Sequence, residues 1–209
     1  MAGIRRLRDI RLLPEVIQVA LQVAQSFEQF KIPYFVVGSV ASSILGEPRS
    51  TNDVDIVAQL SEVRAKEWIV WAEKDFYVSE TAVIEAIRRH RAFNLVHFST
   101  ALKIDIYCAG DSAYEGEQLS RRRLVPVVKD AATSLVMSTP EDVVLNKLCW
   151  YRKGGEVSDR QWRDVIGVLK VQSDRLEFSY LGNWATNLAI SDLLRKALAE
   201  AGLSGASPA

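Results

Sequence analysis

Alternating apolar and polar residues give the first part of the chain the pattern of short strands and helices. Apolar residues at helical spacing over residues 16–30 predict an amphipathic helix. The run "PYFVVGS" that follows is typical of a strand that ends at Gly38 and Ser39. A short helix stopped by Gly46 and a second strand, "VDIVAQL", come next.

The pattern continues in the same style up to about residue 138. Ser61 predicts a helix cap and a helix through about Glu73, and a further helix is predicted over about residues 81–90. "FNLVHFS" and "LKIDIYC" are joined by a short connection and predict an antiparallel pair of strands. "RLVPVV" and "SLVMS" predict edge strands, because Pro126 is poorly tolerated in a central strand.

Helical signals dominate from Thr139 onward. Thr139 and the residues "PED" after it supply a cap, a first-turn proline and two acids at the positive end of a helix. Ser158 of "SDRQ" fits a capping box, and the pattern stays helical to about Glu200. We therefore expect an α+β fold with an α/β core over residues 1–138, a helical domain over 139–202 and a disordered tail over 203–209.

Composition describes an ordinary globular protein. Hydrophobic residues make up 48% of the 209 residues, and 26 basic residues balance 26 acidic ones, so nothing global attracts nucleic acid or an anionic membrane. No apolar run approaches the ~18 residues of a membrane span, and the N-terminus lacks a long apolar region and carries Asp9. Cys108 and Cys149 are interpreted as buried reduced thiols. We expect a cytoplasmic protein with no membrane partner.

Two aspartates stand one residue apart at the start of the second strand. Asp53 and Asp55 project to one face of that strand, and two carboxylates this close repel each other unless a cation lies between them. Asp105 alternates with Ile104 and Ile106 in the same way, and it joins the pair if its strand lies beside theirs. Three carboxylates suit two Mg²⁺ ions and in-line phosphoryl displacement.

A candidate phosphate site precedes the aspartates. Gly38 and Ser39 end a strand and open a helix, where backbone N–H groups bind anions and glycine allows close approach. Arg49 and Thr51 lie just before the aspartates and are predicted to reach the same polyphosphate.

Each of these features also has a structural interpretation. A Gly-Ser pair is usually only a turn, and an isolated Asp-x-Asp or a lone strand aspartate often faces water. Their order along one chain, Gly-Ser before Asp53 and Asp55 and then Asp105, is much harder to obtain by chance. His90 and His97 are interpreted as structural or surface residues.

In the second half the structural interpretation carries more weight. Lys147 on an amphipathic helix would normally be solvated, and Asp164 would normally pair with Arg160 or Arg163 on its own helix. The basic run Arg121–Arg123 is predicted either to lie near an RNA acceptor or to be a solvated turn. Aromatic residues at helical spacings predict core packing rather than base stacking: Trp150, Tyr151, Trp162, Tyr180 and Trp184.

Taken together, the motifs resemble the nucleotidyltransferase superfamily typified by DNA polymerase β and kanamycin nucleotidyltransferase. Its signature has an apolar residue, Gly, Gly or Ser, a spacer of about ten residues, and Asp-x-Asp or Asp-x-Glu. Here "VVGSVASSILGEPRSTNDVDIV" supplies Gly38, Ser39, Asp53 and Asp55, and Asp105 matches the third carboxylate. The resemblance implies a mixed β-sheet with flanking helices, followed by a helical bundle.

A narrower resemblance covers about residues 15 to 200. "RSTNDVDI", "LKIDIY", "TPEDVVLNKLCWYRKGG" and "SDRQWRDVIGVL" are similar to bacterial nucleotidyltransferase-like proteins related to the AbiEii and MenT toxins. In those toxins a lysine contacts the nucleotide, and Lys147 of "NKLCW" occupies its place, while Asp164 matches a later aspartate. This resemblance implies a component of a toxin–antitoxin pair, with a cognate antitoxin or toxin as partner.

The implied reaction moves a nucleotide from an NTP such as ATP to an acceptor hydroxyl, with Mg²⁺ as cofactor. Gly38, Ser39, Arg49, Thr51 and Lys147 are the predicted nucleotide contacts. An RNA end and a protein side chain both remain open as acceptor, and the neutral charge argues mildly against strong RNA affinity. The alternative is a catalytically silent NTP-binding or protein-interaction module, which would be expected to have lost carboxylates.

Overall fold

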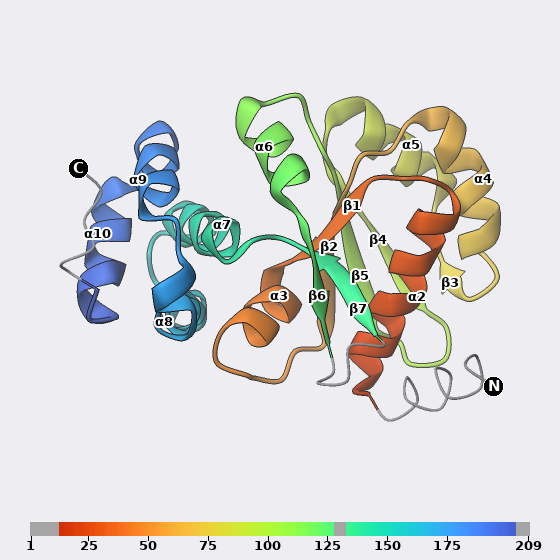
Figure 1. Ribbon diagram of the computed structural model, residues 1–209. Helices are drawn as coiled ribbons and strands as arrows, with labels where there is room; N and C mark the ends of the chain where they lie inside the picture. Colours follow the sequence, from red (N-terminus) through yellow and green to blue (C-terminus); the bar gives the residue numbers. More distant parts are fainter. Residues whose placement is uncertain (1–12, 128–132, 204–209) are drawn as a thin grey trace. The chain divides into compact units, whose positions relative to one another are not determined.

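The computed structural model describes residues 13–127 and 133–203, and these residues form two compact units. Unit 1 contains the described residues of 1–40 and 51–137. Unit 2 contains residues 41–50 together with those from 138 onward. The first unit carries the sheet and the second is helical (Figure 1). The expectations about the N-terminal segment and the tail from residue 204 lie outside the described residues.

A seven-stranded mixed sheet, in the order β3-β4-β5-β2-β1-β7-β6, is the framework of unit 1. Strand β2 pairs with β1 in antiparallel and with β5 in parallel orientation, so the second predicted strand lies at the centre of the sheet. The strands are β1 (Tyr34–Val37), β2 (Asp53–Ala58), β3 (Phe76–Tyr77), β4 (Ala92–His97), β5 (Lys103–Cys108), β6 (Arg123–Pro126) and β7 (Ser134–Met137).

The strand predictions are largely confirmed, with one correction at the end of the sheet. Strands β4 and β5 form the predicted antiparallel pair, and β6, which contains Pro126, is an edge strand. Strand β7 was expected at an edge, and this was wrong, because β7 lies between β1 and β6. The sequence also did not predict the two-residue strand β3, which is too short to have a periodic pattern.

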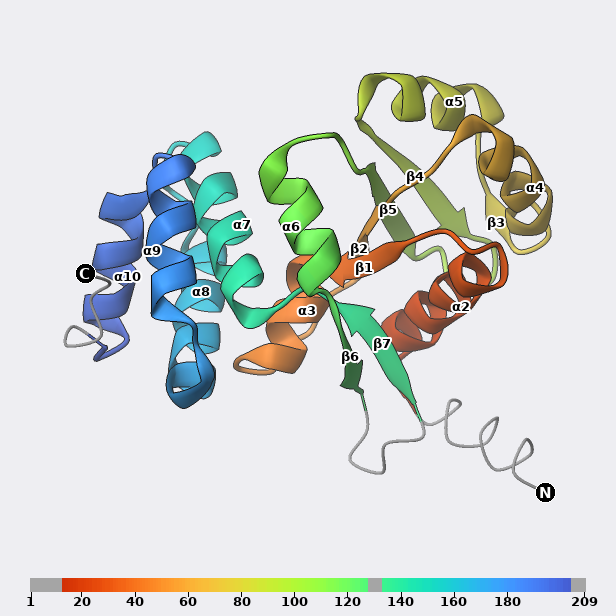
Figure 2. The ribbon, with the colours of Figure 1, turned by 45° about the horizontal axis from the view of Figure 1, so that its top comes forward.

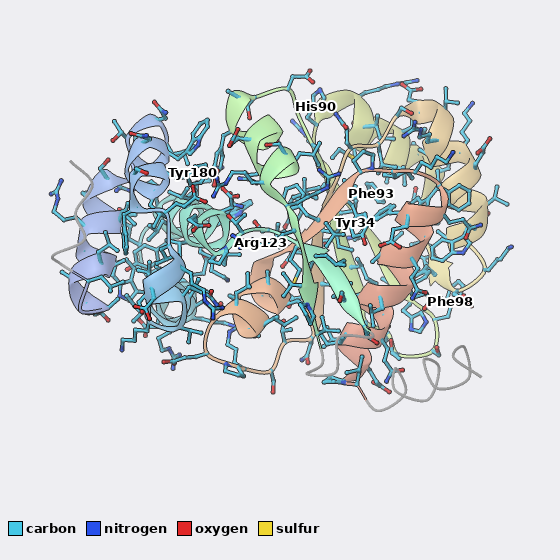
Figure 3. All side chains as sticks on the ribbon, in the orientation of Figure 1. Tyr34, His90, Phe93, Phe98, Arg123 and Tyr180 are labelled. Atoms are coloured by element: carbon cyan, nitrogen blue, oxygen red, sulfur yellow. The ribbon has the colours of Figure 1, made fainter. Side chains whose placement is uncertain are left out.

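One face of the sheet is covered by helices with an aromatic cluster beneath them. The ring of Trp68 stacks on Phe27 at 5.1 Å and meets Phe93 edge-on at 6.1 Å, and Tyr34 lies 5.5 Å from Phe27. Figure 3 labels Tyr34 and Phe93 of this cluster. Phe93 is in register with Ile106, so this cluster marks the face that carries the buried isoleucines. The helices of unit 1 are α2 (Glu15–Gln29), α4 (Glu62–Ala72), α5 (Glu80–Arg89) and α6 (Ala113–Arg121).

Polar caps set the ends of several helices. The hydroxyl of Ser61 accepts a hydrogen bond from the N–H of Arg64, as predicted, and those of Ser79 and Ser112 cap α5 and α6 in the same way. Helix α6 was not predicted, because its nine residues carry only two buried side chains. Figure 2 shows it as a separate helix between β5 and β6 in the chain.

Unit 2 is a group of helices that also includes a segment from much earlier in the chain. Thr139 and Ser158 cap α7 and α8 through their hydroxyls, as predicted. Residues 41–50 pack with these helices, since the N–H₂ group of Gln172 donates to the carbonyl of Leu45. The helices are α3 (Gly38–Leu45), which begins in unit 1, and α7 (Pro140–Lys153), α8 (Asp159–Gln172), α9 (Phe178–Asn187) and α10 (Ser191–Glu200), with a 3₁₀ turn at Ser173–Arg175.

Several side-chain expectations can be compared with the structure. Cys108 and Cys149 are free thiols, and burial raises the pKa of Cys108 to about 11. Tyr151 packs on Trp162 with ring centroids 5.2 Å apart, whereas Trp150 was wrongly expected in the core and is 51% exposed. Within the described ranges, no helix is both long enough and apolar enough to cross a membrane.

The aromatic cluster predicts a clear stability difference between two tryptophans of α4. We expect Trp68→Phe to lower the free energy of unfolding by about 2 kcal/mol, because the smaller ring leaves a void and removes the 2.9 Å hydrogen bond to Ser26. Trp71→Phe is the matched control at a half-buried position and should cost much less. Urea unfolding checks both, and equal losses would contradict the assignment of Trp68 as the centre of the cluster.

Candidate functional site

The three predicted carboxylates lie on the face of the sheet opposite the aromatic cluster. In the parallel pairing of β2 with β5, Asp53 is in register with Lys103 and Asp55 is in register with Asp105. Because in-register residues share a face and neighbouring strands are about 4.8 Å apart, these four side chains form the corners of one small patch. We call it the carboxylate patch. Val54 and Ile104 point the other way and are fully buried.

Lys103 is the basic corner of the carboxylate patch. Its Nζ atom lies 2.8 Å from Oδ1 and 2.9 Å from Oδ2 of Asp105, so the ammonium contacts both oxygens. Lys103 was not among the residues predicted from the sequence. The alternation in "LKIDIYC" could have identified it, because this pattern puts residues 103, 105 and 107 on one face.

Tyr107 is the second residue that the sequence analysis missed. Its hydroxyl donates to Oδ1 of Asp55 at 3.4 Å. Burial is the largest of the causes that raise the pKa of Tyr107 to about 12, and the negative charges of Asp55, Asp105 and Asp53 contribute in the same direction. One phenol therefore feels all three carboxylates, as expected if their charges converge on one region of the sheet.

Gly38 brings the start of α3 against the carboxylate patch. Val37, the residue before it, is in register with Asp55. Gly38 has a φ of 63°, and a Cβ atom placed on it would lie 1.9 Å from Oδ2 of Asp55. Only glycine fits here, both for the left-handed backbone and for the space. Ser39 follows as the second residue of the helix, so the predicted anion-binding turn and the predicted acids are neighbours.

Thr51 acts on an aspartate in the structure. Its hydroxyl donates to Oδ1 of Asp53 at 2.5 Å. This contact fixes the orientation of the Asp53 carboxylate at the start of β2. The predicted phosphate contact of Thr51 stays a prediction.

The donor set suits a hard cation, but the number of ligands is small. Among the described residues, no three His, Cys, Asp or Glu side chains are grouped closely enough to hold a metal ion. Mg²⁺ needs only one or two protein carboxylates when water and substrate phosphates fill its other positions. Asp53 and Asp55 meet that lower requirement, since they are the two adjacent acids of one strand face.

Two other predicted nucleotide contacts, Arg49 and Lys147, meet at a buried carboxylate within unit 2. Arg49 donates to Asp164 through Nε at 2.6 Å and Nη2 at 2.7 Å, and Lys147 donates through Nζ at 2.8 Å. The hydroxyl of Ser42 also lies 3.2 Å from Oδ2 of Asp164. Asp164 therefore pairs with residues from other elements, and the expected pairing with Arg160 or Arg163 is not found.

The electrostatics of this buried cluster are those of a stabilised carboxylate. The Asp164 side chain is only 6% exposed. Burial alone would raise its pKa, but the hydrogen bonds and charges of Arg49 and Lys147 outweigh burial and lower the pKa to about 2. Arg49 and Lys147 as nucleotide contacts stay a prediction.

The remaining polar candidates have structural surroundings. Arg121 ends α6, Arg122 donates to the carbonyl of Leu119, and the exposed Arg123 begins β6, so the basic run lies at a junction between a helix and a strand. His90 caps α5 in the left-handed region, and Nδ1 of His97 contacts the hydroxyl of Thr100 at 2.8 Å. Both histidines are thus structural, as the sequence indicated.

The contact of Gly38 with Asp55 predicts an unusually costly alanine substitution. We expect Gly38→Ala to lower the free energy of unfolding by about 2 kcal/mol or more, because the positive φ is strained and the methyl group displaces the carboxylate. Gly116→Ala in α6 is the matched control, since nothing lies within 4 Å of its Cβ position, and it should be neutral or stabilising. Chemical denaturation distinguishes them, and a Gly38→Ala variant as stable as the parent would contradict the geometry.

The buried cluster predicts a specific pH dependence of stability. The depressed pKa of Asp164 stabilises the fold above the unfolded value near 4, and this stabilisation is lost as the pH falls toward 2. It amounts to about 2 kcal/mol. Asp164→Asn should lack this component and cost about 3–5 kcal/mol at pH 7, because it strands two cations. The exposed Asp174→Asn is the control, and a stability gap between parent and Asp164→Asn that stays constant from pH 5 to pH 2 would refute the assignment.

Solved structures match this chain in fold. An antigenic nucleotidyltransferase-like protein from Paracoccidioides brasiliensis matches with a TM-score of 0.55 and 15% identity, over 93% of this chain and 94% of that one. The antibiotic-resistance factor ANT(2'')-Ia matches with a TM-score of 0.48 and 12% identity, over 88% and 94% of the two chains. The lincosamide antibiotic adenylyltransferase LnuA, bound to lincomycin, gives 0.45 and 12%, over 72% and 94%.

At 12–15% sequence identity, these matches show similarity of fold alone. The chain matches no protein-family model. It also matches no curated protein sequence. The narrower resemblance to AbiEii and MenT toxins stays a prediction. The expected α+β fold is confirmed: the mixed sheet with its flanking helices has the fold of nucleotidyltransferase-like proteins.

Proposed function

We propose that this protein is a nucleotidyltransferase that moves an NMP from an NTP to an acceptor hydroxyl. The observation that carries the proposal is the carboxylate patch next to the Gly38 turn. Asp53, Asp55 and Asp105 share one sheet face, and the start of α3 contacts Asp55. The fold also supports the proposal, because it matches the fold of a nucleotidyltransferase-like protein.

The start of α3 is the proposed phosphate-binding element. Its first N–H groups lack helical partners and carry the positive end of the helix dipole. Gly38 has no Cβ, so the backbone can approach both Asp55 and a triphosphate closely. The hydroxyl of Ser39 adds a donor at the same turn. Asp53 and Asp55 would hold Mg²⁺ beside these phosphates, where the ion supplies charge neutralisation and orients the α-phosphate.

Asp105 takes the proton of the acceptor in this proposal. The acceptor oxygen attacks the α-phosphorus and forms the new P–O bond. The bond from the α-phosphorus to the oxygen that bridges to the β-phosphate breaks, so pyrophosphate leaves with the bonding electrons. Positioning and electrostatic stabilisation account for most of such a rate enhancement. Thr51 contributes by orienting Asp53.

Arg49 and Lys147 have a secondary place in the proposal. Arg49 is a proposed phosphate contact because it lies just before the aspartates, and Lys147 by resemblance, yet within unit 2 both donate to Asp164. The proposal therefore rests on unit 1. A hydroxyl of RNA or of a protein is the proposed acceptor, and the role in a toxin–antitoxin pair depends on the AbiEii and MenT resemblance alone.

Substitution of the paired aspartates tests the chemistry. We expect Asp53→Asn and Asp55→Asn each to lower the transfer of labelled nucleotide by about 10³-fold or more while the melting temperature stays near that of the parent protein. Asp111→Asn is the matched control, because its side chain is 99% exposed and lies on the same unit. Full activity in both Asp53→Asn and Asp55→Asn would refute the proposal.

A lysate incubated with the protein, Mg²⁺ and each of the four α-labelled NTPs identifies the acceptor. Label that resists protease and is lost with ribonuclease indicates RNA, and the reverse indicates protein. Binding of an NTP in the presence of metal with no labelled product would favour the catalytically silent module instead.

A further inference from the structure

Lys103, the basic corner of the carboxylate patch, has no role in the proposed reaction. Asp53, Asp55 and Asp105 hold three of the four corners, and Lys103 holds the fourth. Asp55 faces Asp105 across the strands, and Asp53 faces Lys103. An ammonium group therefore occupies the position where a further ligand of a second metal ion would otherwise be expected.

The contact between Lys103 and Asp105 engages the whole carboxylate. Nζ lies 2.8 Å and 2.9 Å from the two oxygens, so a cation that approaches Asp105 has to compete with the ammonium for both of them. The two residues are two positions apart on one strand, which places their side chains on the same face without any change of fold. Loss of the lysine would leave Asp105 as a third carboxylate beside Asp55.

Charge in the carboxylate patch fits one divalent ion better than two. Three carboxylates and one ammonium carry a formal charge of −2, which a single divalent cation neutralises. A second divalent cation at Asp105 would lie next to a positive charge and be repelled by it. No group of three His, Cys, Asp or Glu side chains that could hold a metal ion occurs among residues 13–127 and 133–203.

We propose that Lys103 takes the place of a second metal ion at Asp105, so that the site works with one divalent cation held by Asp53 and Asp55. This inference rests on the proposed function and changes the number of metal ions expected from the sequence from two to one. Lys103 supplies a fixed positive charge next to the acid that receives the proton of the acceptor. The lysine at position 103 then sets the number of metal ions that the site binds.

Counting bound Mn²⁺ tests the proposal without any turnover. The full-length protein is titrated with Mn²⁺ alone, and the free ion is measured by electron paramagnetic resonance. We expect one bound Mn²⁺ in the parent protein, one in Asp105→Asn and none in Asp55→Asn. We expect two in Lys103→Met and again one in the double variant Lys103→Met, Asp105→Asn.

Lys66→Met is the matched control, because it removes the same charge from an exposed position on α4 of the same unit. It should bind one ion, and a second ion in this variant would overturn the proposal, because the effect would then be one of overall charge. Lys103→Gln gives a second test if the methionine variant unfolds, as judged by its melting temperature. Two ions in the parent, or one ion in both Lys103 variants, would also overturn the proposal.

The outcomes distinguish a failure of this inference from a failure of the proposed function on which it rests. Two Mn²⁺ ions in the parent, one of them lost in Asp105→Asn, would leave the nucleotidyltransferase proposal standing with two metals. No bound Mn²⁺ in the parent would overturn the metal-dependent function and this inference with it.

Discussion

The close packing of a carboxylate against a backbone without a side chain is the constraint on which the candidate site depends. Asp55 lies so near Gly38 that any Cβ would collide with it. That contact joins the end of β1, the start of α3 and the middle of β2 at one point. Because β2 is central in the sheet and paired on both sides, the point is fixed by the framework rather than by a loop. The proposed anion-binding turn and the acids are therefore held together by the protein itself.

The two units differ in how their charged side chains are paired. In unit 2 the buried Asp164 is paired with Arg49 and Lys147, so one carboxylate meets two cations. The four corner side chains of the carboxylate patch in unit 1, three acids and one lysine, carry a formal charge of −2. A group of acids with an excess of negative charge suits an external cation, whereas a carboxylate with two cationic neighbours does not. This contrast is why the proposal rests on the patch.

Periodicity in the sequence predicted the local elements and the faces of the strands well. The alternation around Asp53 and Asp105 indicated shared faces, and the register of β2 with β5 then brings Asp55 beside Asp105. Three features could not be predicted in this way. The partners of Asp164 depend on which distant segments meet, the place of β7 between β1 and β6 depends on sheet order, and α6 has too narrow an apolar stripe. Lys103 and Tyr107 were predictable from the same alternation, because it places residues 103, 105 and 107 on one face of β5.

The assignment of residues 41–50 to unit 2 has a consequence for how the chain acquires its structure during synthesis. Arg49 emerges from the ribosome 115 residues before its partner Asp164, and Ser42 emerges 122 residues before it. The sheet can gather its first strands early, but the buried charge cluster has to wait until α8 has been made. A cut at residue 138 would give a C-terminal fragment with Lys147 and Asp164 but no Arg49. Unit 2 therefore needs segments from both halves of the chain, and its charge cluster can form only after the later one has been made.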